Sequence, residues 1–151
     1  MNKDVKKILI VDDSPKDVEL AIAALAEKNL ENEVVVAEDG VEALDYLFKR
    51  GKFAGCDNGN PAVILLDIKM PRMNGIEVLR HIRSNLRFKY IPVIVVTSSR
   101  EERDLVESYK LGANSYVVKP VDIIQFIEAI KDLGQYWAVT NQPPPASTHQ
   151  D

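Results

Sequence analysis

The sequence predicts an α/β fold in which one doubly wound parallel sheet is covered by helices. Apolar runs of strand length recur five times along the 151 residues, and segments with helical spacing separate them. The runs are continuous stretches of Val, Ile and Leu rather than alternating apolar and polar residues, which is typical of strands buried on both faces of a parallel sheet. The five predicted strands are residues 8–11, 34–37, 62–66, 93–96 and 115–118.

Capping residues mark the starts of three of the predicted helices. Three polar residues each stand three positions before an acidic residue, as a side chain that caps a helix N-terminus does; they are Ser14 (before Asp17), Asp39 and Ser99. Proline suits the first helical position, which Pro15 occupies. Gly112 is predicted to end the fourth helix as a left-handed cap. The first helix is predicted to pack on the sheet through apolar residues spaced by three and four, namely Val18, Ala21, Ile22 and Leu25.

The length is that of one domain, and we expect it to span residues 1–138. Residues 49–61 are rich in Gly and Asn and exceed a typical connection, so they are predicted to form an exposed insert. Residues 139–151 contain a proline triplet and few apolar groups, which predicts an extended or flexible tail. No effector domain is expected after residue 138, so output is predicted to pass through protein contact.

Composition narrows the classes of function. The net charge is −4 with no long basic run, which argues against direct binding of nucleic acid. There is no signal-peptide core and no apolar stretch near the ~18 residues of a membrane span, so we predict a cytoplasmic protein without membrane association. Cys56 is the single cysteine, which excludes an internal disulfide and a multi-thiolate metal site. A free thiol is predicted, and an intermolecular bridge stays open.

Charged or reactive residues directly follow four of the five predicted strands. The carboxyl ends of parallel strands meet at one edge, where doubly wound sheets bind their ligands. Each residue alone has an ordinary explanation as a cap, a turn residue or a surface charge, and the acidic pair alone is best explained as the opening of a solvated loop. Their shared edge instead predicts a site, formed by Asp12, Asp13, Asp67, Thr97 and Lys119.

Three carboxylates and one ammonium at this edge leave an excess of negative charge that a divalent cation would neutralise. Mg²⁺ suits the set because it prefers oxygen ligands and takes only one or two direct carboxylates. No His or Cys lies near these strand ends, which disfavours zinc. With Mg²⁺ bound, a phosphoryl group becomes a suitable guest, held also by Lys119 and Thr97. Asp67 is the predicted nucleophile, because the third strand is central in the flavodoxin-like order 2-1-3-4-5.

Four motifs resemble the receiver domain of two-component response regulators, a family that includes the chemotaxis regulators. They are VDDS at 11–14, LLDIKMPRMNG at 65–75, VVTSS at 95–99 and VVKP at 117–120, and the match spans about residues 6–133. The resemblance implies a (βα)5 fold and a single-domain regulator in a phosphorelay. Such a protein is not an enzyme acting on outside substrates, since it catalyses only its own phosphorylation and dephosphorylation. The insert and the ending LGQYW to PPP also resemble stand-alone regulators of bacterial, chiefly cyanobacterial, phytochromes.

The resemblance to receiver domains implies that Asp67 accepts a phosphoryl group from a sensor histidine kinase. The resemblance to phytochrome regulators implies that this kinase is of phytochrome type. Thr97 and Lys119 would hold the phosphoryl oxygens. The implied Mg²⁺ ligands are Asp13, Asp67 and the backbone carbonyl of Lys69, with Asp12 acting mostly through water.

The resemblance also implies a switch. Phosphorylation would draw Thr97 toward the new group and let Tyr116 turn, changing the surface of the fourth helix, fifth strand and fifth helix. Without the motif, Tyr116 is explained as an ordinary half-buried strand aromatic. The bond before Pro120 matches one that is usually cis, which is physically reasonable only because proline follows. In the fifth helix Ile124 and Tyr136 fall off the apolar stripe, which suggests a homodimer or partner surface; the stripe contains Ile123, Phe126, Ile127, Ile130, Leu133 and Trp137.

Three other functions fit parts of the sequence. A Mg²⁺-dependent phosphohydrolase would place Asp-x-Asp after the first strand, whereas here the two acids are adjacent and Asp67 comes later. A flavin or nucleotide carrier is disfavoured because no phosphate-binding loop motif is present. A constitutive adaptor that has lost phosphorylation stays open, although all five site residues are retained.

Overall fold

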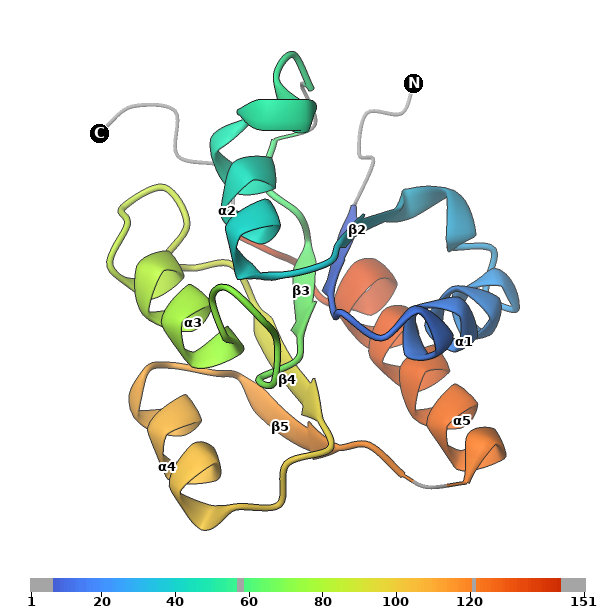
Figure 1. Ribbon diagram of the computed structural model, residues 1–151. Coiled ribbons are helices and arrows are strands. Elements are labelled where there is room, and N and C mark those ends of the chain that lie inside the picture. Colours follow the sequence, from blue (N-terminus) through green and yellow to red (C-terminus); the bar gives the residue numbers. More distant parts are fainter. Residues whose placement is uncertain (1–6, 57–58, 121, 145–151) are drawn as a thin grey trace.

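A computed structural model describes residues 7–56, 59–120 and 122–144 and contains one five-stranded parallel sheet (Figure 1). The strand order is β2-β1-β3-β4-β5. The predicted doubly wound fold and its order are therefore confirmed, and each strand lies within one residue of its predicted bounds. The strands are β1 (Ile8–Val11), β2 (Val34–Ala37), β3 (Val63–Leu66), β4 (Val93–Thr97) and β5 (Ser115–Val118).

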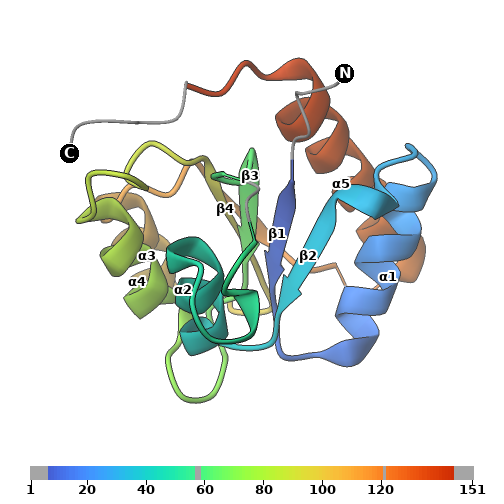
Figure 2. The same cartoon turned by 90° about the horizontal axis from the view of Figure 1, so that it is seen from above.

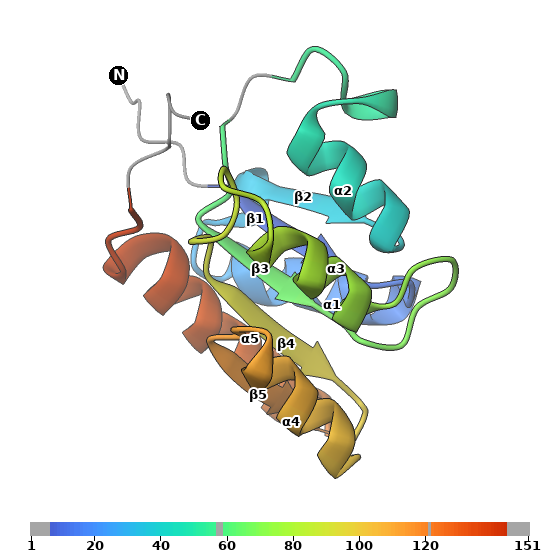
Figure 3. The same cartoon turned by 90° about the vertical axis from the view of Figure 1, so that its left-hand side faces the viewer.

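Helices cover both faces of the sheet, as Figures 2 and 3 show. They are α1 (Pro15–Ala26), α2 (Gly40–Phe48), α3 (Gly75–Arg83), α4 (Glu102–Lys110) and α5 (Ile123–Gly134). The pair α1 and α5 lies on one face, and α2, α3 and α4 lie on the other. Because successive strand residues point to opposite faces, Ile8 and Ile10 of β1 join the core under α1 and α5, while Leu9 and Val11 join the other. None of the described helices is long and apolar enough for a membrane crossing.

Two of the three predicted caps are confirmed. The Ser14 side chain accepts a hydrogen bond from the backbone N–H of Asp17 at 3.3 Å, and Asp39 accepts one from Glu42 at 2.9 Å. Gly112 follows α4 with φ +96°, as expected of a left-handed cap.

The predicted cap at Ser99 is wrong. α4 begins at Glu102 with Glu101 before it, and no side chain caps the helix. The Ser99 hydroxyl instead donates to Asp104 at 2.6 Å and accepts from the Glu101 N–H at 3.3 Å. Ser99 therefore bonds an acid in the first turn of α4 and a backbone N–H that precedes the helix, instead of capping it.

The insert is more firmly anchored than its composition predicts. Most of its described residues are exposed, Cys56 among them, but Phe53 closes a short 3₁₀ turn and is only 9% exposed. Its ring packs edge-on against Tyr46 of α2, with ring centroids 5.1 Å apart. One large apolar residue therefore pins the insert to the core at the end of the sheet where β3 begins.

The last helix differs from the prediction at both ends. Ile123, expected on the buried stripe, is 49% exposed, because the first helical position is not covered by the sheet. α5 continues into a π-helical turn, Gln135–Thr140, two residues beyond the predicted end of the domain. The buried Ala138 holds this turn against the core. Ile124 and Tyr136 are 71% and 50% exposed, as the periodicity predicts. Of the predicted tail, residues 145–151 lie outside the described residues.

Substituting the anchor of the insert tests its contribution. We expect Phe53→Ala to lower the free energy of unfolding by about 2–4 kcal/mol, since it removes a buried ring and leaves a cavity. Leu86→Ala is the control, because Leu86 is 66% exposed and should change stability by less than about 0.5 kcal/mol. Urea unfolding followed by circular dichroism measures both. A loss below about 1 kcal/mol for Phe53→Ala would show that the insert is only loosely attached.

Candidate functional site

The carboxyl ends of the strands carry the predicted site residues. Asp12 and Asp13 follow β1, Asp67 follows β3, Thr97 ends β4 and Lys119 follows β5. Asp12, Asp67 and Thr97 are buried, while Asp13 is exposed. Carboxylate oxygens of the three acids all lie within 4.8 Å of one another. The structure thus brings together acids that are far apart in the chain.

Backbone hydrogen bonds continue the ladder past the strand ends and position these side chains. The N–H of Asp67 donates to Val11 of β1 at 2.9 Å, and the N–H of Lys119 donates to Thr97 of β4 at 2.8 Å. The Asp12 N–H donates to the last carbonyl of β2 at 3.1 Å. The acids and the lysine are therefore held by the rigid sheet rather than by mobile loops.

Lys119 is the cation of this cluster. Its side chain is only 10% exposed, and its ammonium donates to Asp17 at 2.7 Å, Asp12 at 2.8 Å and Asp67 at 3.2 Å. Burial by itself disfavours the ammonium. The hydrogen bonds to Asp12 and Asp17 and the charge of Asp67 outweigh it and raise the pKa of Lys119. Lys119 therefore stays charged at neutral pH.

Asp17 also belongs to this cluster, although its sequence position indicates only the acidic residue that follows the Ser14 cap. Asp17 is the third residue of α1, and α1 starts directly after the acidic pair. An acid in the first turn of that helix necessarily lies at the same edge of the sheet. An acidic residue in the first turn of the helix that follows β1 is therefore the sequence feature that indicates Asp17 as a site residue.

The cluster holds more negative than positive charge. Three carboxylates bond Lys119, namely Asp12, Asp17 and Asp67, and Asp13 lies within 4.8 Å of Asp12 and Asp67. Like charges about 4 Å apart repel by about 4 kcal/mol at an effective dielectric of about 20. Burial raises the pKa of Asp12, and the hydrogen bonds from Lys119 and the Ser14 N–H offset this only in part. Ionisation of Asp12 is therefore less favourable in the folded chain than in water.

The donor set fits a hard divalent cation. Asp12, Asp13 and Asp67 offer only carboxylate oxygens, and the described residues place no His or Cys in this group. Oxygen donors suit Mg²⁺, Mn²⁺ and Ca²⁺ rather than zinc or copper. The backbone N–H of Lys69 lies 3.4 Å from Asp67, so this loop closes over the acids.

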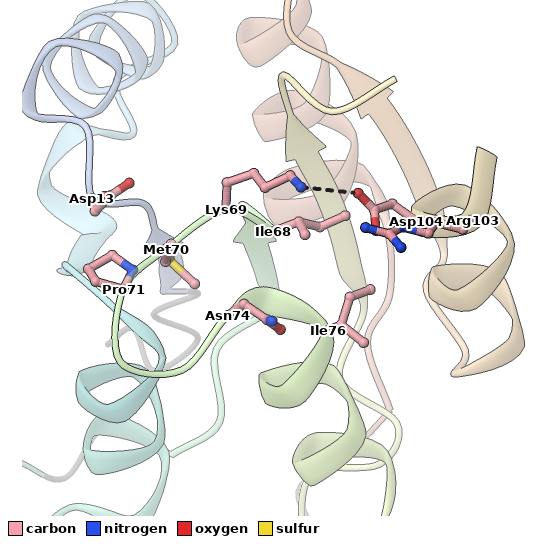
Figure 4. Close-up of a pocket in the computed structure, with 9 residues that line it drawn as sticks. All are labelled: Asp13, Ile68, Lys69, Met70, Pro71, Asn74, Ile76, Arg103 and Asp104. Carbon is pink, nitrogen blue, oxygen red and sulfur yellow. Dashed lines mark ion pairs between the residues drawn. The ribbon is translucent and has the colours of Figure 1, made fainter. Parts of the chain in front are cut away.

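A cavity of about 430 Å³ opens beside Asp13 (Figure 4). Apolar side chains of the β3–α3 loop and α3 form one wall, and the first turn of α4 forms the other. The Lys69 ammonium crosses this space toward Asp104 at 3.7 Å. The lining residues are Asp13, Ile68, Lys69, Met70, Pro71, Asn74, Ile76, Arg103 and Asp104.

Thr97 and Tyr116 each form a hydrogen bond with Ser99, which their sequence positions do not predict. The fully buried Thr97 hydroxyl accepts from the Ser99 N–H at 3.3 Å, and the Tyr116 hydroxyl donates to the Ser99 carbonyl at 3.1 Å. Burial raises the pKa of Tyr116, which keeps this donor protonated. Because Ser99 also bonds Asp104, the acidic edge is connected to α4 through one serine.

The predicted cis bond before Pro120 is wrong for this structure. The described residues contain no cis peptide bond, so the Lys119–Pro120 bond is trans. Trans is the more stable isomer even before proline, by about 0.5–1 kcal/mol.

A parallel sheet in this order, with three acids and a lysine at its carboxyl edge, defines a receiver domain. Residues 8–131 match the response regulator receiver domain, and the chain belongs to this family. It is 33% identical to response regulator Rcp1 of Synechocystis sp. over 141 residues, which are 93% of this chain and 95% of Rcp1.

Solved structures of phytochrome response regulators resemble the chain over 93% of its length. The phosphorylated cyanobacterial phytochrome response regulator RcpA is 37% identical, with a TM-score of 0.86 over 99% of that chain. The Mn²⁺-bound form of Rcp1 is 32% identical, with a TM-score of 0.85 over 99% of that chain. The bacteriophytochrome response regulator RtBRR is 55% identical, with a TM-score of 0.73 over 84% of that chain. The chain is therefore related to phytochrome response regulators.

Neutralising Asp12 tests the cost of burying its charge. A folded-state pKa above the ordinary carboxyl value means that ionisation costs stability at neutral pH, and that this cost disappears as the pH falls through the folded pKa. In metal-free protein we expect Asp12→Asn to raise the free energy of unfolding by about 1 kcal/mol at about pH 7, with a smaller gain near pH 4. Thermal melts in chelator measure it, with exposed Asp132→Asn as control. A loss of stability at neutral pH would show that the attraction of Lys119 outweighs burial.

Gly75 packs directly against the backbone of Asp67. A Cβ there would overlap the Asp67 carbonyl oxygen and approach the Ile68 Cα to 2.9 Å. We expect Gly75→Ala to cost about 2–4 kcal/mol of stability and to weaken divalent metal binding, because the loop after β3 must shift. Gly59→Ala is the control: its Cβ meets nothing within 4 Å, so only its positive φ costs stability, about 1 kcal/mol. Unchanged metal affinity in folded Gly75→Ala protein would contradict the expectation.

Proposed function

We propose that this chain is a single-domain response regulator whose Asp67 accepts a phosphoryl group from a histidine of a sensor kinase, with Mg²⁺ as cofactor. The observation that carries the proposal is the ammonium of Lys119, 3.2 Å from Asp67 and buried beside two further acids. A buried lysine and an acidic pair around one carboxylate are what transfer of an anionic group to that carboxylate requires. The constitutive adaptor has no comparable use for this arrangement.

We assign the acceptor role to Asp67 because it follows β3, the central strand, with the acids that follow β1 on one side and Lys119 from the end of β5 on the other. An oxygen of Asp67 attacks phosphorus; the new O–P bond forms as the P–N bond to the donor histidine breaks, and that electron pair leaves on the imidazole nitrogen. Lys119 and the Thr97 hydroxyl would bind the phosphoryl oxygens.

Asp13, Asp67 and the Lys69 carbonyl would hold Mg²⁺ directly, and Asp12 would act mostly through water. Bound Mg²⁺ would neutralise part of their charge and that of the incoming phosphoryl group. The Mn²⁺-bound form of the relative Rcp1 supports a divalent metal here. The chain's own part is to keep Asp12 and Asp67 buried and fixed on the sheet, so that they are already assembled when the metal arrives.

Output follows from the contacts of Ser99. A phosphoryl group adds nearly two negative charges and draws Thr97 toward it, which disturbs the bonds that Thr97 and Tyr116 make to Ser99. The change would pass to α4, β5 and α5, where apolar side chains are exposed, namely Leu105, Val106, Tyr109, Ile124 and Tyr136. This surface would bind a partner protein or a second copy of the chain. The relatives support a phytochrome-type kinase as the donor.

Labelling with a small phosphodonor tests the acceptor. Incubated with acetyl phosphate and Mg²⁺, the protein should gain the mass of one phosphoryl group, and chelator should abolish the gain. Asp67→Asn should lose at least about 99% of the labelling, since an amide is not a nucleophile at neutral pH. Exposed Asp132→Asn should label like the wild type. Labelling of the Asp67→Asn protein, found by intact mass spectrometry, would remove Asp67 from its role.

A further inference from the structure

We propose that Asp17 is a positioning residue of this site: it holds the ammonium of Lys119 in the unphosphorylated protein and must release it before Lys119 can bind a phosphoryl oxygen. This inference rests on the proposed function. It assigns a role to a carboxylate that none of the four sequence motifs includes among the site residues. Asp17 would act on the phosphoryl group only through the lysine.

The hydrogen bonds of Lys119 leave no donor free. An ammonium has three N–H groups, and Lys119 has three carboxylate acceptors, of which Asp17 is the nearest at 2.7 Å. A phosphoryl oxygen can therefore bind Lys119 only if one of the three carboxylates gives up its bond. All three N–H donors of Lys119 are therefore in use before the reaction begins.

Asp17 is the acceptor that can leave. The side chains of Asp12 and Asp67 are 9% and 8% exposed, so either would be a buried charge that keeps only one backbone N–H donor if it lost the ammonium. The Asp17 side chain is 30% exposed, so its carboxylate regains water on release. It also stays in the first turn of α1, where the helix N-terminus favours a negative charge. The backbone N–H of Asp17 is fixed by the Ser14 cap, so only the side chain has to turn.

Removing this competitor should therefore favour the phosphorylated form. Asp17→Asn keeps the size and the helix position but weakens the hold on the ammonium, because a neutral acceptor binds it less strongly than a carboxylate. We expect beryllofluoride, a mimic of the phosphoryl group on Asp67, to bind the Asp17→Asn protein about three- to tenfold tighter than wild type in saturating Mg²⁺.

Calorimetric titration with beryllofluoride tests this, with thermal melts to verify folding. Glu19→Gln is the matched control, since Glu19 is exposed on the same helix, carries the same charge and takes no part in the bonds of Lys119; its affinity should stay within about twofold of wild type. If Asp17→Asn folds poorly, Asp17→Ser takes its place. It also removes the carboxylate and should show the same gain in affinity. The effect of Asp17→Asn is measured again in a Lys119→Gln background, where the gain in affinity should vanish.

Two results would overturn the role of Asp17 alone. One is unchanged or weaker binding by the Asp17 variants while wild type binds and Asp67→Asn does not. The other is an equal gain with and without Lys119, which would make Asp17 a through-space charge rather than a holder of the lysine. Failure of wild type itself to bind beryllofluoride with Mg²⁺ would overturn the proposed function, and the inference with it.

Discussion

The bonds of the Lys119 ammonium to two buried carboxylates, at the carboxyl end of the sheet, are the interaction on which the rest of this structure depends. The order β2-β1-β3-β4-β5 places β1 beside β3, so Asp12 and Asp67 meet across neighbouring strands. Within the described part of the chain, Lys119 is the cation that joins them, from the end of β5. The fold thus holds two buried acids around one ammonium, and the oxygen donors of the acidic group fit a hard divalent cation.

The same strand ends connect the acids to the surface. β4 ends in Thr97, which contacts Ser99, and β5 carries Tyr116, which contacts the same residue. Ser99 in turn bonds Asp104 in the first turn of α4. Three hydrogen bonds on one loop residue therefore link a buried hydroxyl to an exposed helix. Ser99 therefore lies between the buried Thr97 at the acidic edge and the first turn of α4.

The sequence predicts the strands and helices more fully than it predicts the contacts between distant side chains. Continuous apolar runs located all five strands, and the rule that parallel strands share a carboxyl edge brought Asp67 and Lys119 to one place. Spacing cannot say which acceptor a flexible side chain selects, so Asp17 and Ser99 were assigned to caps alone. Composition likewise could not show that Phe53 turns inward, because one buried ring among Gly and Asn leaves no periodic signal. The trans bond before Pro120 depends on an energy difference too small to infer from sequence.

The anchored insert occupies the opposite end of the sheet from the acids. β3 runs between them, and its four residues extend roughly 13 Å at about 3.3 Å per residue. Phe53 holds the insert against α2 at that far end, through its ring contact with Tyr46. Substitutions among the exposed residues of the insert should therefore leave the hydrogen bonds of the buried acids unchanged.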